Sequence, residues 1–293
     1  MWQNTSETKM TNMSEITERP TNFLFFILYP AHAAAISGLI ACSVLGLFNW
    51  LDLLYFLVGW VFIYGIGVHT VLHRLVSHRA FEPRKYLSPL LLWLASMSLQ
   101  GSPLWWAALH RGSHHRYCDT ERDTHSPING IWYAWHGWIY HWPKYFNPRN
   151  VVDLVKDPLH VFFADHYSKI ILITYLVVGL ISWKILLFGF LLPAAIGLYQ
   201  ENFINVLCHV RRFGYRNFDT QDNSTNITLL AWTNWGQGWH NNHHQLASSY
   251  DFGTSVSGKS SEFDPSLLLL PLIATKSSRE KIFTARREKK LVS

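Results

Sequence analysis

Residues 51–78 read LDLLYFLVGWVFIYGIGVHTVLHRLVSH. From Leu51 to Leu72 the only charged side chain is Asp52, and a helix that crosses a membrane needs about 20 mostly apolar residues. Two histidines, His73 and His78, follow directly. The stretch therefore predicts a transmembrane helix that ends in candidate metal ligands at one face of the membrane.

Three more apolar runs predict an all-α integral membrane protein with four transmembrane helices. The spans are expected near residues 29–48, 51–71, 170–183 and 185–207. Another apolar run, residues 86–109, is interrupted by two prolines and a glycine. If that run crossed the membrane, His110 would lie on the opposite side from His73. We therefore expect a buried or re-entrant hairpin that returns to the same face.

The composition agrees with a membrane protein. Of the 293 residues, 49% are hydrophobic and only 15% are charged, whereas a soluble domain carries about 25% charged residues. The formal charge is +6, but the basic residues lie between and after the apolar runs, which disfavours nucleic-acid binding. The three cysteines are odd in number and widely spaced, so a disulfide framework is not expected.

The distribution of positive charge predicts the orientation. Of the 25 Lys and Arg residues only Lys184 lies in an outside loop, which leaves 25 − 1 = 24 on one side. The positive-inside rule makes that side cytoplasmic, so both termini and every histidine cluster are expected there, on a helical cap. We expect a cytoplasmic tail at residues 1–22, a membrane domain at residues 23–252 and a second cytoplasmic tail at residues 253–293.

Three histidine-rich boxes supply most of the candidate metal ligands. In the third box the histidines are spaced i, i+3 and i+4, which places them on one face of a helical turn. A single zinc ion takes four ligands, so the number of histidines suits two ions, and ligation without thiolates suits iron, copper or zinc. The candidate ligands are His73, His78, His110, His114, His115, His209, His240, His243 and His244. Asn205 precedes His209 by one helical turn and could hold a metal-bound water.

The surroundings of the boxes supply further candidates. A metal-bound imidazole usually donates its other N–H to a carboxylate or a carbonyl. Asp119, Glu121 and Asp123 follow the second box and could accept these bonds, although each could also belong to a solvated acidic turn. Trp235 and Trp239 flank the start of the third box and could line a substrate tunnel or sit at the membrane interface.

The order and spacing of these motifs resemble the membrane-bound fatty acid desaturases, in particular the Δ9 acyl-CoA and acyl-lipid desaturase group. The first box matches as His73-Arg74-Leu75-Val76-Ser77-His78, and Gly238-Trp239-His240-Asn241-Asn242-His243-His244 resembles the third. Residues 119–127 resemble the acidic stretch of that family, and residues 205–209 its N-x-x-x-H element. There are two departures: the second box has three residues between His110 and His114, where the acyl-CoA enzymes usually have two, and Gln237 replaces a frequent Glu.

The resemblance implies an oxygen-dependent oxidoreductase with a cofactor of two iron ions, held by the nine histidines and by a water on Asn205. It would introduce a cis double bond, at the Δ9 position, into a saturated acyl-CoA or acyl-lipid that enters a kinked tunnel. The implied partners are this substrate, dioxygen, membrane lipid and a cytochrome b5-like or ferredoxin-like electron donor; no nucleic acid is expected.

Two alternatives stay open at this point. A membrane diiron hydroxylase could use the same metals and spans. A non-enzymatic membrane metal-binding protein would need ionisable residues along a path through the membrane. Only His32 is a candidate for such a path, while the other histidines cluster at one face.

Overall fold

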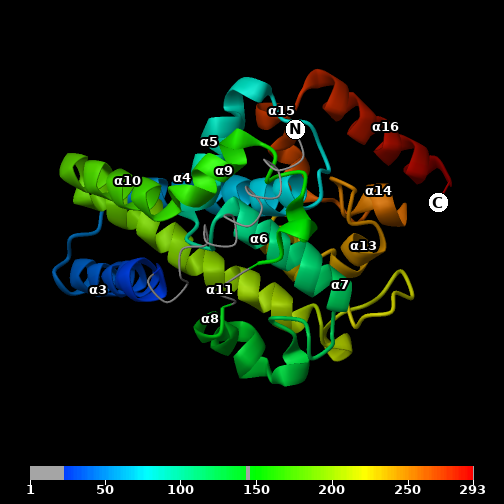
Figure 1. Cartoon of the computed structure of the whole chain (residues 1–293), viewed down its shortest axis with the longest axis horizontal. Helices are drawn as coiled ribbons and strands as arrows, with labels where there is room; N and C mark the ends of the chain where they lie inside the picture. Colours follow the sequence, from blue (N-terminus) through cyan, green and yellow to red (C-terminus); the bar gives the residue numbers. More distant parts are fainter. Residues whose placement is uncertain (1–22, 143–145, 293) are drawn as a thin grey trace, which may run out of the picture.

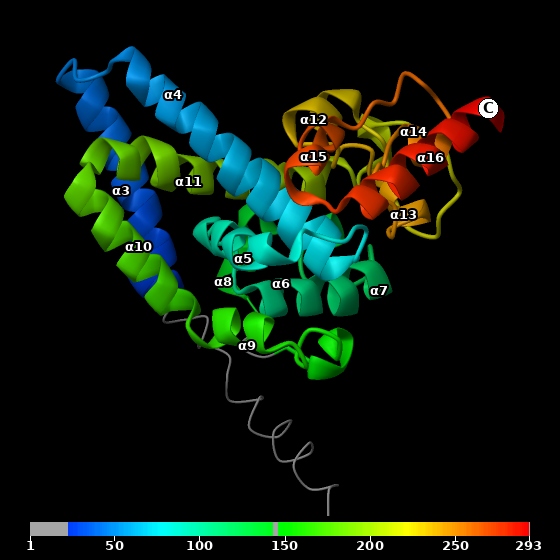
Figure 2. The same cartoon turned by 90° about the horizontal axis from the view of Figure 1, so that it is seen from above.

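The computed structural model describes residues 23–142 and 146–292. Within these residues the helices supply the regular secondary structure, and β-pairing is limited to three isolated bridges. Figure 1 shows the helices, and Figure 2 shows that α3, α4 and α10 project from one end of the molecule while the C-terminal helices gather at the other. The predicted all-α class is confirmed.

The membrane-spanning part consists of long apolar helices. Three continuous helical stretches are long and apolar enough to cross a membrane, at 24–44, 50–77 and 185–207, with mean hydropathies of 1.8, 1.9 and 1.3. A fourth span is possible because α9 and α10 pass the same test together, although they are bent by 68°. The elements are η2 (Leu24–Leu28), α3 (Tyr29–Val44), α4 (Trp50–Gly59), η3 (Trp60–Ser77), α9 (Pro158–Asp165), α10 (Tyr167–Ile181), η9 (Ile185–Leu191) and α11 (Leu192–Leu207).

The two turns at the far end of the spans are joined by one ion pair. Asn49 caps α4, because its side chain accepts from the N–H groups of Leu51 and Asp52. Lys184, in the turn before η9, donates to the Leu47 carbonyl at 2.6 Å and to the Asp52 carboxylate at 2.8 Å. Asp52 is buried and Lys184 is largely so, and the pair connects the two turns.

The hairpin after the first box does not cross the membrane. Helices α5 (Ser88–Met97) and α6 (Pro103–Leu109) both pack against η3. At about 1.5 Å per residue they are roughly 15 and 10 Å long, too short to span about 30 Å of hydrocarbon. The turn between them uses positive φ at Leu99 and Gly101. The hairpin therefore returns His110 to the side of His73, as predicted.

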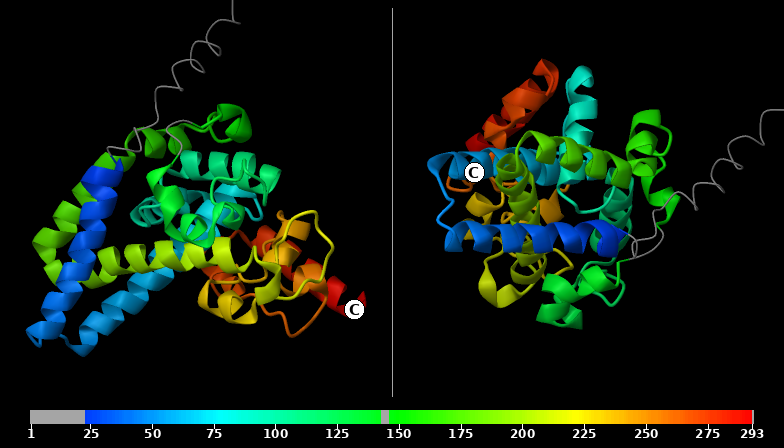
Figure 3. Two further views of the ribbon diagram at one scale, coloured as in Figure 1. Left: turned by 90° about the horizontal axis from the view of Figure 1, so that it is seen from below. Right: turned by 90° about the vertical axis from the view of Figure 1, so that its left-hand side faces the viewer.

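The remaining helices, all of them short except α16, build the cap around the boxes. They are η4 (Lys85–Leu87), η5 (His110–His114), α7 (His115–Tyr117), η6 (Pro127–Asn129), η7 (Tyr133–Gly137), α8 (Trp138–Tyr140), η8 (Pro148–Val151), η10 (Arg211–Phe213), α12 (Thr228–Thr233), α13 (His240–Gln245), α14 (Thr254–Ser257), η11 (Pro265–Leu268), α15 (Leu270–Ile273) and α16 (Lys276–Val292). Figure 3 shows the C-terminal group beside the end of α11.

The segment expected as a C-terminal tail is packed into this cap. Arg74 of η3 is fully buried; it donates to the Tyr250 carbonyl and to the Asp264 carboxylate, each at 2.9 Å. The buried carboxylate of Asp251 in turn pairs with Arg286 of α16. A buried arginine needs such partners, so residues after 252 belong to the same body as the first box and not to a separate tail.

Candidate metal centre

Nine histidine side chains converge in the structure, and they form two groups. The ring nitrogens within each group all lie within 4.8 Å of one another. The five-histidine group contains His73, His78, His110, His115 and His243, and the four-histidine group contains His114, His209, His240 and His244. Every histidine proposed from the boxes, together with His209, is thus brought into one of the two groups.

The ring nitrogens that meet are the Nε2 atoms. In the five-histidine group the Nε2 atoms of His73 and His243 are 3.0 Å apart, and those of His78 and His110 are 2.9 Å apart. In the four-histidine group the Nε2 atom of His240 lies 2.8 Å from that of His209 and 3.1 Å from that of His244.

These separations fit the coordination of a metal ion. A metal–imidazole bond of about 2.1 Å places neighbouring ligands at right angles roughly 3.0 Å apart and opposite ligands roughly 4.2 Å apart. A purely hydrogen-bonded cluster would need alternating donors and acceptors, and one nitrogen cannot serve several neighbours in this way. The donor set, made only of imidazoles in each group, is one that iron, copper and zinc accept.

The first box reaches a common focus because the end of η3 is wound wider than an α-helix. Two residues five positions apart lie about 140° apart around an α-helix of 3.6 residues per turn. Here the N–H of His78 donates to the carbonyl of His73, five residues back, at 3.1 Å. This wide turn brings both imidazoles to one side of the helix.

The second box uses the same device. In η5 the N–H of His115 donates to the carbonyl of His110, so the turn holds one residue more than an α-helical turn. The extra residue noted in the sequence is absorbed in this way, and His110 and His115 both join the five-histidine group. His114, rotated away from its neighbour, joins the other group.

The third box remains α-helical and divides between the groups. His240 and His244 are four residues apart in α13 and lie in the four-histidine group, while His243 lies in the five-histidine group. Figure 1 shows α13 next to α7, which carries His115. This helix therefore connects the two candidate metal positions.

Three aspartates support the four-histidine group from behind. The Nδ1 atoms of His114, His209 and His244 lie 3.1, 3.3 and 2.8 Å from carboxylate oxygens. The three partners are Asp123, Asp119 and Asp222, respectively. Because Nδ1–H donates to a carboxylate, the lone pair of each ring is left on Nε2, where a metal would bind.

The partner of the first box is an amide. The side-chain amide of Gln237 lies 2.5 Å from Nδ1 of His73. For Nε2 of His73 to carry the lone pair, Nδ1 must hold the proton and the amide must present its oxygen to it. A neutral group thus takes the place that a carboxylate takes behind the other group.

The structure does not bring three of the residues proposed from sequence to the site. Glu121 is exposed and makes no side-chain contact with a histidine within the described residues. Trp239 is buried against Ala231 and Phe252, and its indole N–H donates to the Phe263 carbonyl at 2.9 Å. Trp235 packs against Trp60. Neither tryptophan lines the pocket that opens onto the histidine groups.

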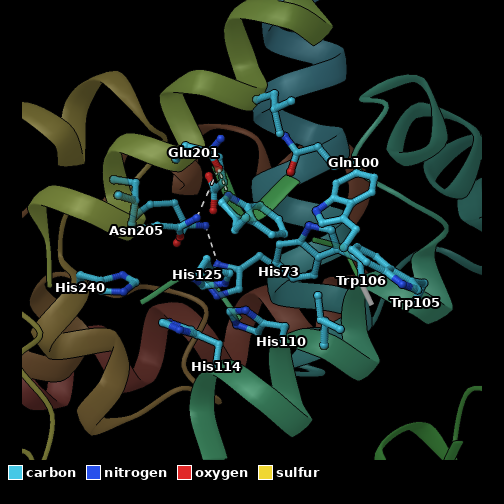
Figure 4. Close-up of a pocket in the computed structure, with 17 residues that line it drawn as sticks. His73, Gln100, Trp105, Trp106, His110, His114, His125, Glu201, Asn205 and His240 are labelled. Carbon is cyan, nitrogen blue, oxygen red and sulfur yellow. Dashed lines mark hydrogen bonds between the residues drawn. The ribbon is translucent and has the colours of Figure 1, made fainter. Parts of the chain in front are cut away.

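A narrow pocket does open onto both histidine groups. Its aromatic wall consists of Trp105 and Trp106 of α6 and Trp138 and Trp142 at the α8 end, and Figure 4 shows the first two beside His73 and His110. Asn205 lies on the opposite wall near His240. The free volume is about 40 Å³, so an acyl chain requires side chains in this wall to move.

Several residues of this region were not predicted from the sequence. Glu201 is the only acidic residue between residues 185 and 207; it lines the pocket and lies 3.5 Å from Nδ1 of His69. An ionisable residue within a span is itself a signal for a functional position. Asp222 carried no such signal, because nothing in a loop sequence links it to a histidine 22 residues later.

Electrostatics distinguish His114 from the other rings of the site whose pKa is shifted; in its own group burial lowers the pKa of His240, and that of His244 to about 4. Burial, followed by the positive charge of Arg111, lowers the pKa of His78 to about 3. Burial also lowers the pKa of His110, His115 and His243. For His114 burial acts in the same direction, but the Asp123 carboxylate outweighs it and raises the pKa. The rings of the five-histidine group are therefore neutral near pH 7, the state in which imidazole binds a metal.

Comparison with known proteins agrees with this geometry. Residues 48–248 match the family model described as fatty acid desaturase. A sn-1 stearoyl-lipid 9-desaturase of Anabaena variabilis is 33% identical over 240 residues, which cover 79% of this chain and 83% of the relative. A sn-2 palmitoyl-lipid 9-desaturase of a Nostoc species is 30% identical over 230 residues, 76% of this chain and 77% of the relative. An acyl-CoA 5-desaturase of Anemone leveillei is 33% identical over 213 residues, 70% and 63% of the two chains.

The family match covers more than half of the chain, and its limits enclose all three histidine boxes. The apolar spans mark a membrane protein, and histidine groups that could bind metal lie together at the end of those spans. The chain is a membrane oxidoreductase that belongs to the fatty acid desaturase family.

Proposed function

We propose that this protein is a diiron desaturase that introduces a cis double bond at the 9 position of a saturated acyl chain carried by a membrane glycerolipid. The observation that supports this best is the sorting of the nine histidines into groups of five and four that open onto one pocket. The names of the two cyanobacterial relatives support the 9 position and the lipid carrier.

Each histidine group would hold one iron ion through its Nε2 atoms, and a water on Asn205 would complete the four-histidine position. The iron pair supplies the activation of dioxygen, which the protein side chains cannot provide. Per turnover, dioxygen, two electrons and two protons are consumed, two hydrogens leave adjacent methylenes, and two water molecules form.

The protein's own contribution is position and exclusion of water. Methylenes offer no polar group for recognition, so the reacting carbons must be selected by how far the chain enters the pocket and where it bends. The four tryptophans supply an apolar wall for this purpose, and the small free volume keeps bulk water out. The aspartates behind the four-histidine group orient the rings.

The proposed orientation places the active site and both termini in the cytoplasm. Two observations support this orientation. Among the basic residues only Lys184 lies in the turns at the other ends of the spans, and His78 and His209 lie at the inner ends of their spans. The two electrons would then come from a soluble carrier on the cytoplasmic side, of the cytochrome b5 or ferredoxin type.

Expression in a desaturase-deficient host, followed by mass spectrometry that locates double bonds in each lipid class, tests the proposal. We expect a new 9-monounsaturated acid in glycerolipids and none with the His243→Ala variant. The His160→Ala variant is the matched control, because His160 pairs with Asp157 outside both groups. Hydroxy acids would replace the proposal by a hydroxylase, and a product confined to the acyl-CoA pool would overturn the lipid carrier.

A further inference from the structure

A second cavity, separate from the narrow pocket lined by Trp105, Trp106, Trp138 and Trp142 (the tryptophan pocket), borders the five-histidine group at His78. It is open, has a volume of about 520 Å³ and is lined at its base by Ser77 and His78. The two cavities share no lining residue: the tryptophan pocket borders His73 and His110, whereas this one borders His78. One proposed iron position is thus approached from two separate sides.

The wall of this cavity is strongly basic. Four of its side chains are cationic and one is acidic: Arg79, Arg111, Arg149, Lys156 and Asp153, a local balance of 4 − 1 = +3. Arg79 and Arg111 both pair with Asp153, whereas Arg149 and Lys156 are exposed and form no ion pair within the described residues. Two cations are therefore free to meet an anionic partner.

Arg111 makes the base of the cavity rigid. It donates to the backbone carbonyls of Val76 and Ser77, each at 2.6 Å, and holds Asp153 through both carboxylate oxygens. The end of the first box and the loop after η8 are thus connected beside His78. A partner that binds here meets a preformed surface, which lowers the entropy cost of docking.

Arg79 adds an independent observation. It ends η3 with φ at +51°, the left-handed region in which glycine is favoured at a helix end. The long side chain nevertheless stays at the cavity rim, where it is 62% exposed. Such a strained cation at a rim is consistent with a binding role.

We propose that this cavity, defined by Arg79, Arg149, Lys156 and the edge of His78, is the docking site of an acidic, soluble one-electron carrier. This inference rests on the proposed diiron function and names the surface at which its electrons enter. Electron transfer falls off steeply with distance, and a carrier docked here would be separated from the five-histidine position by the His78 ring.

The position of the cavity favours a carrier over a substrate headgroup. An acyl chain whose headgroup lay here would have to pass the histidine group to reach the tryptophan pocket. A carrier needs no such passage, because it exchanges only electrons. Two docking events, each of which oxidises the carrier by one electron, supply the two electrons consumed per turnover. Interfaces of this transient kind are small, charged and dependent on salt.

The test compares two charge reversals in the full-length, iron-loaded protein in nanodiscs. One variant is Arg149→Glu/Lys156→Glu, and the matched control is Lys281→Glu/Arg287→Glu on α16, which changes the charge equally on an exposed surface. Figure 2 shows α9, directly after Lys156, and α16 on opposite sides of α6. Binding of a ferredoxin and of the soluble haem domain of cytochrome b5 is measured by NMR titration at several salt concentrations, and iron is quantified throughout.

We expect the cavity variant to weaken binding of the acidic carrier at low salt by roughly tenfold and to flatten the salt dependence, with unchanged iron. Turnover driven by dithionite should stay as in the parent protein, and the control variant should bind normally. Equal binding by both variants would overturn the proposal. Loss of dithionite-driven turnover at unchanged iron would assign the cavity to the acyl carrier and also overturn it, whereas absence of any product from the parent protein would instead refute the proposed function.

Discussion

The two histidine groups lie side by side, but the protein supports them differently. The four-histidine group has carboxylates behind three of its rings, while behind His73 in the five-histidine group lies the neutral amide of Gln237. The five-histidine group has one more imidazole, and it borders a basic cavity.

This difference shows how one protein can prepare two metal positions for different tasks. A carboxylate behind an imidazole raises its basicity and stabilises a more highly charged metal. An amide orients the ring without that charge. On the proposed function, the four-histidine position with the Asn205 water is the more strongly charge-compensated of the two, and the five-histidine position is the one nearer to the proposed source of electrons.

The largest effect should follow from the loss of a ring in the third box. The change His243→Ala removes one ligand of the five-histidine group. The four remaining histidines of that group would then hold the iron ion weakly or not at all. We expect iron content to fall by about half or more and activity to fall by more than the roughly hundredfold that loss of an outer partner costs. Elemental analysis and product assay check this; His160→Ala with normal values for both is the required control.

The carboxylates behind the four-histidine group should matter next. The change Asp222→Ala removes the acceptor of His244 at 2.8 Å, and we expect iron affinity at that group to fall by about 10–100-fold. Competition with a chelator measures it. Asp157→Ala removes a comparable partner from His160 at 3.0 Å, away from both groups, and should leave affinity unaltered. Equal loss in both variants would contradict an electrostatic role for Asp222.

Two histidines, His114 of the four-histidine group and His78 of the five-histidine group, should respond to pH in opposite ways in the iron-free protein. The raised pKa of His114 contributes stability below its unfolded pKa of about 6.5, which is lost as pH rises through the folded value. The lowered pKa of His78, about 3, has the opposite sign: stability is present above about 6.5 and is lost as pH falls toward 3. NMR titration of labelled imidazoles measures both pKa values. The same titration midpoint for His114 and His78 would contradict the prediction.

A smaller effect is expected at the amide. The change Gln237→Glu places a carboxylate behind His73 and should make the five-histidine group resemble the other, with a several-fold gain in iron affinity. The change Gln237→Ala should lower that affinity by up to about tenfold, since His73 loses its buried partner at 2.5 Å. Site-resolved Mössbauer spectra distinguish the two iron positions. Equal spectra for the parent protein and Gln237→Glu would show that the group behind His73 does not affect the iron at the five-histidine position.

The smallest effect is expected at Glu121, which the sequence suggested as an outer partner. Its side chain is exposed, so Glu121→Gln should change neither iron affinity nor product yield. A loss comparable to that of Asp222→Ala would show that the loop after the second box closes onto the site in the working enzyme.

Much of the site could be predicted because it depends on local patterns. An apolar run of about 20 residues next to a histidine box is a span with ligands at its end, whatever the rest of the chain does. The charge bias and the hairpin at residues 86–109 then placed the boxes on one side. Asp119 and Asp123 were found because they follow the second box closely.

Other parts could not be predicted because they depend on contacts distant in sequence. Asp222 and Gln237 meet their histidines only after the cap has folded, and the tryptophans of the pocket come from α6 and α8 instead of from the third box. The segment after residue 252 looked polar enough for a tail, yet Asp264 is needed to neutralise the buried Arg74.

The sequence by itself determined the all-α membrane class, the family, three of the apolar spans and the nine candidate histidines, since each of these is written in composition or short-range spacing. Only the tertiary structure decided which histidine joins which group. Two wide helical turns, at His73–His78 and His110–His115, bring to one side of the helix two rings that a regular α-helix would point in different directions. Such turns are stabilised by packing and by the convergence of the rings themselves, and neither is visible in a linear pattern.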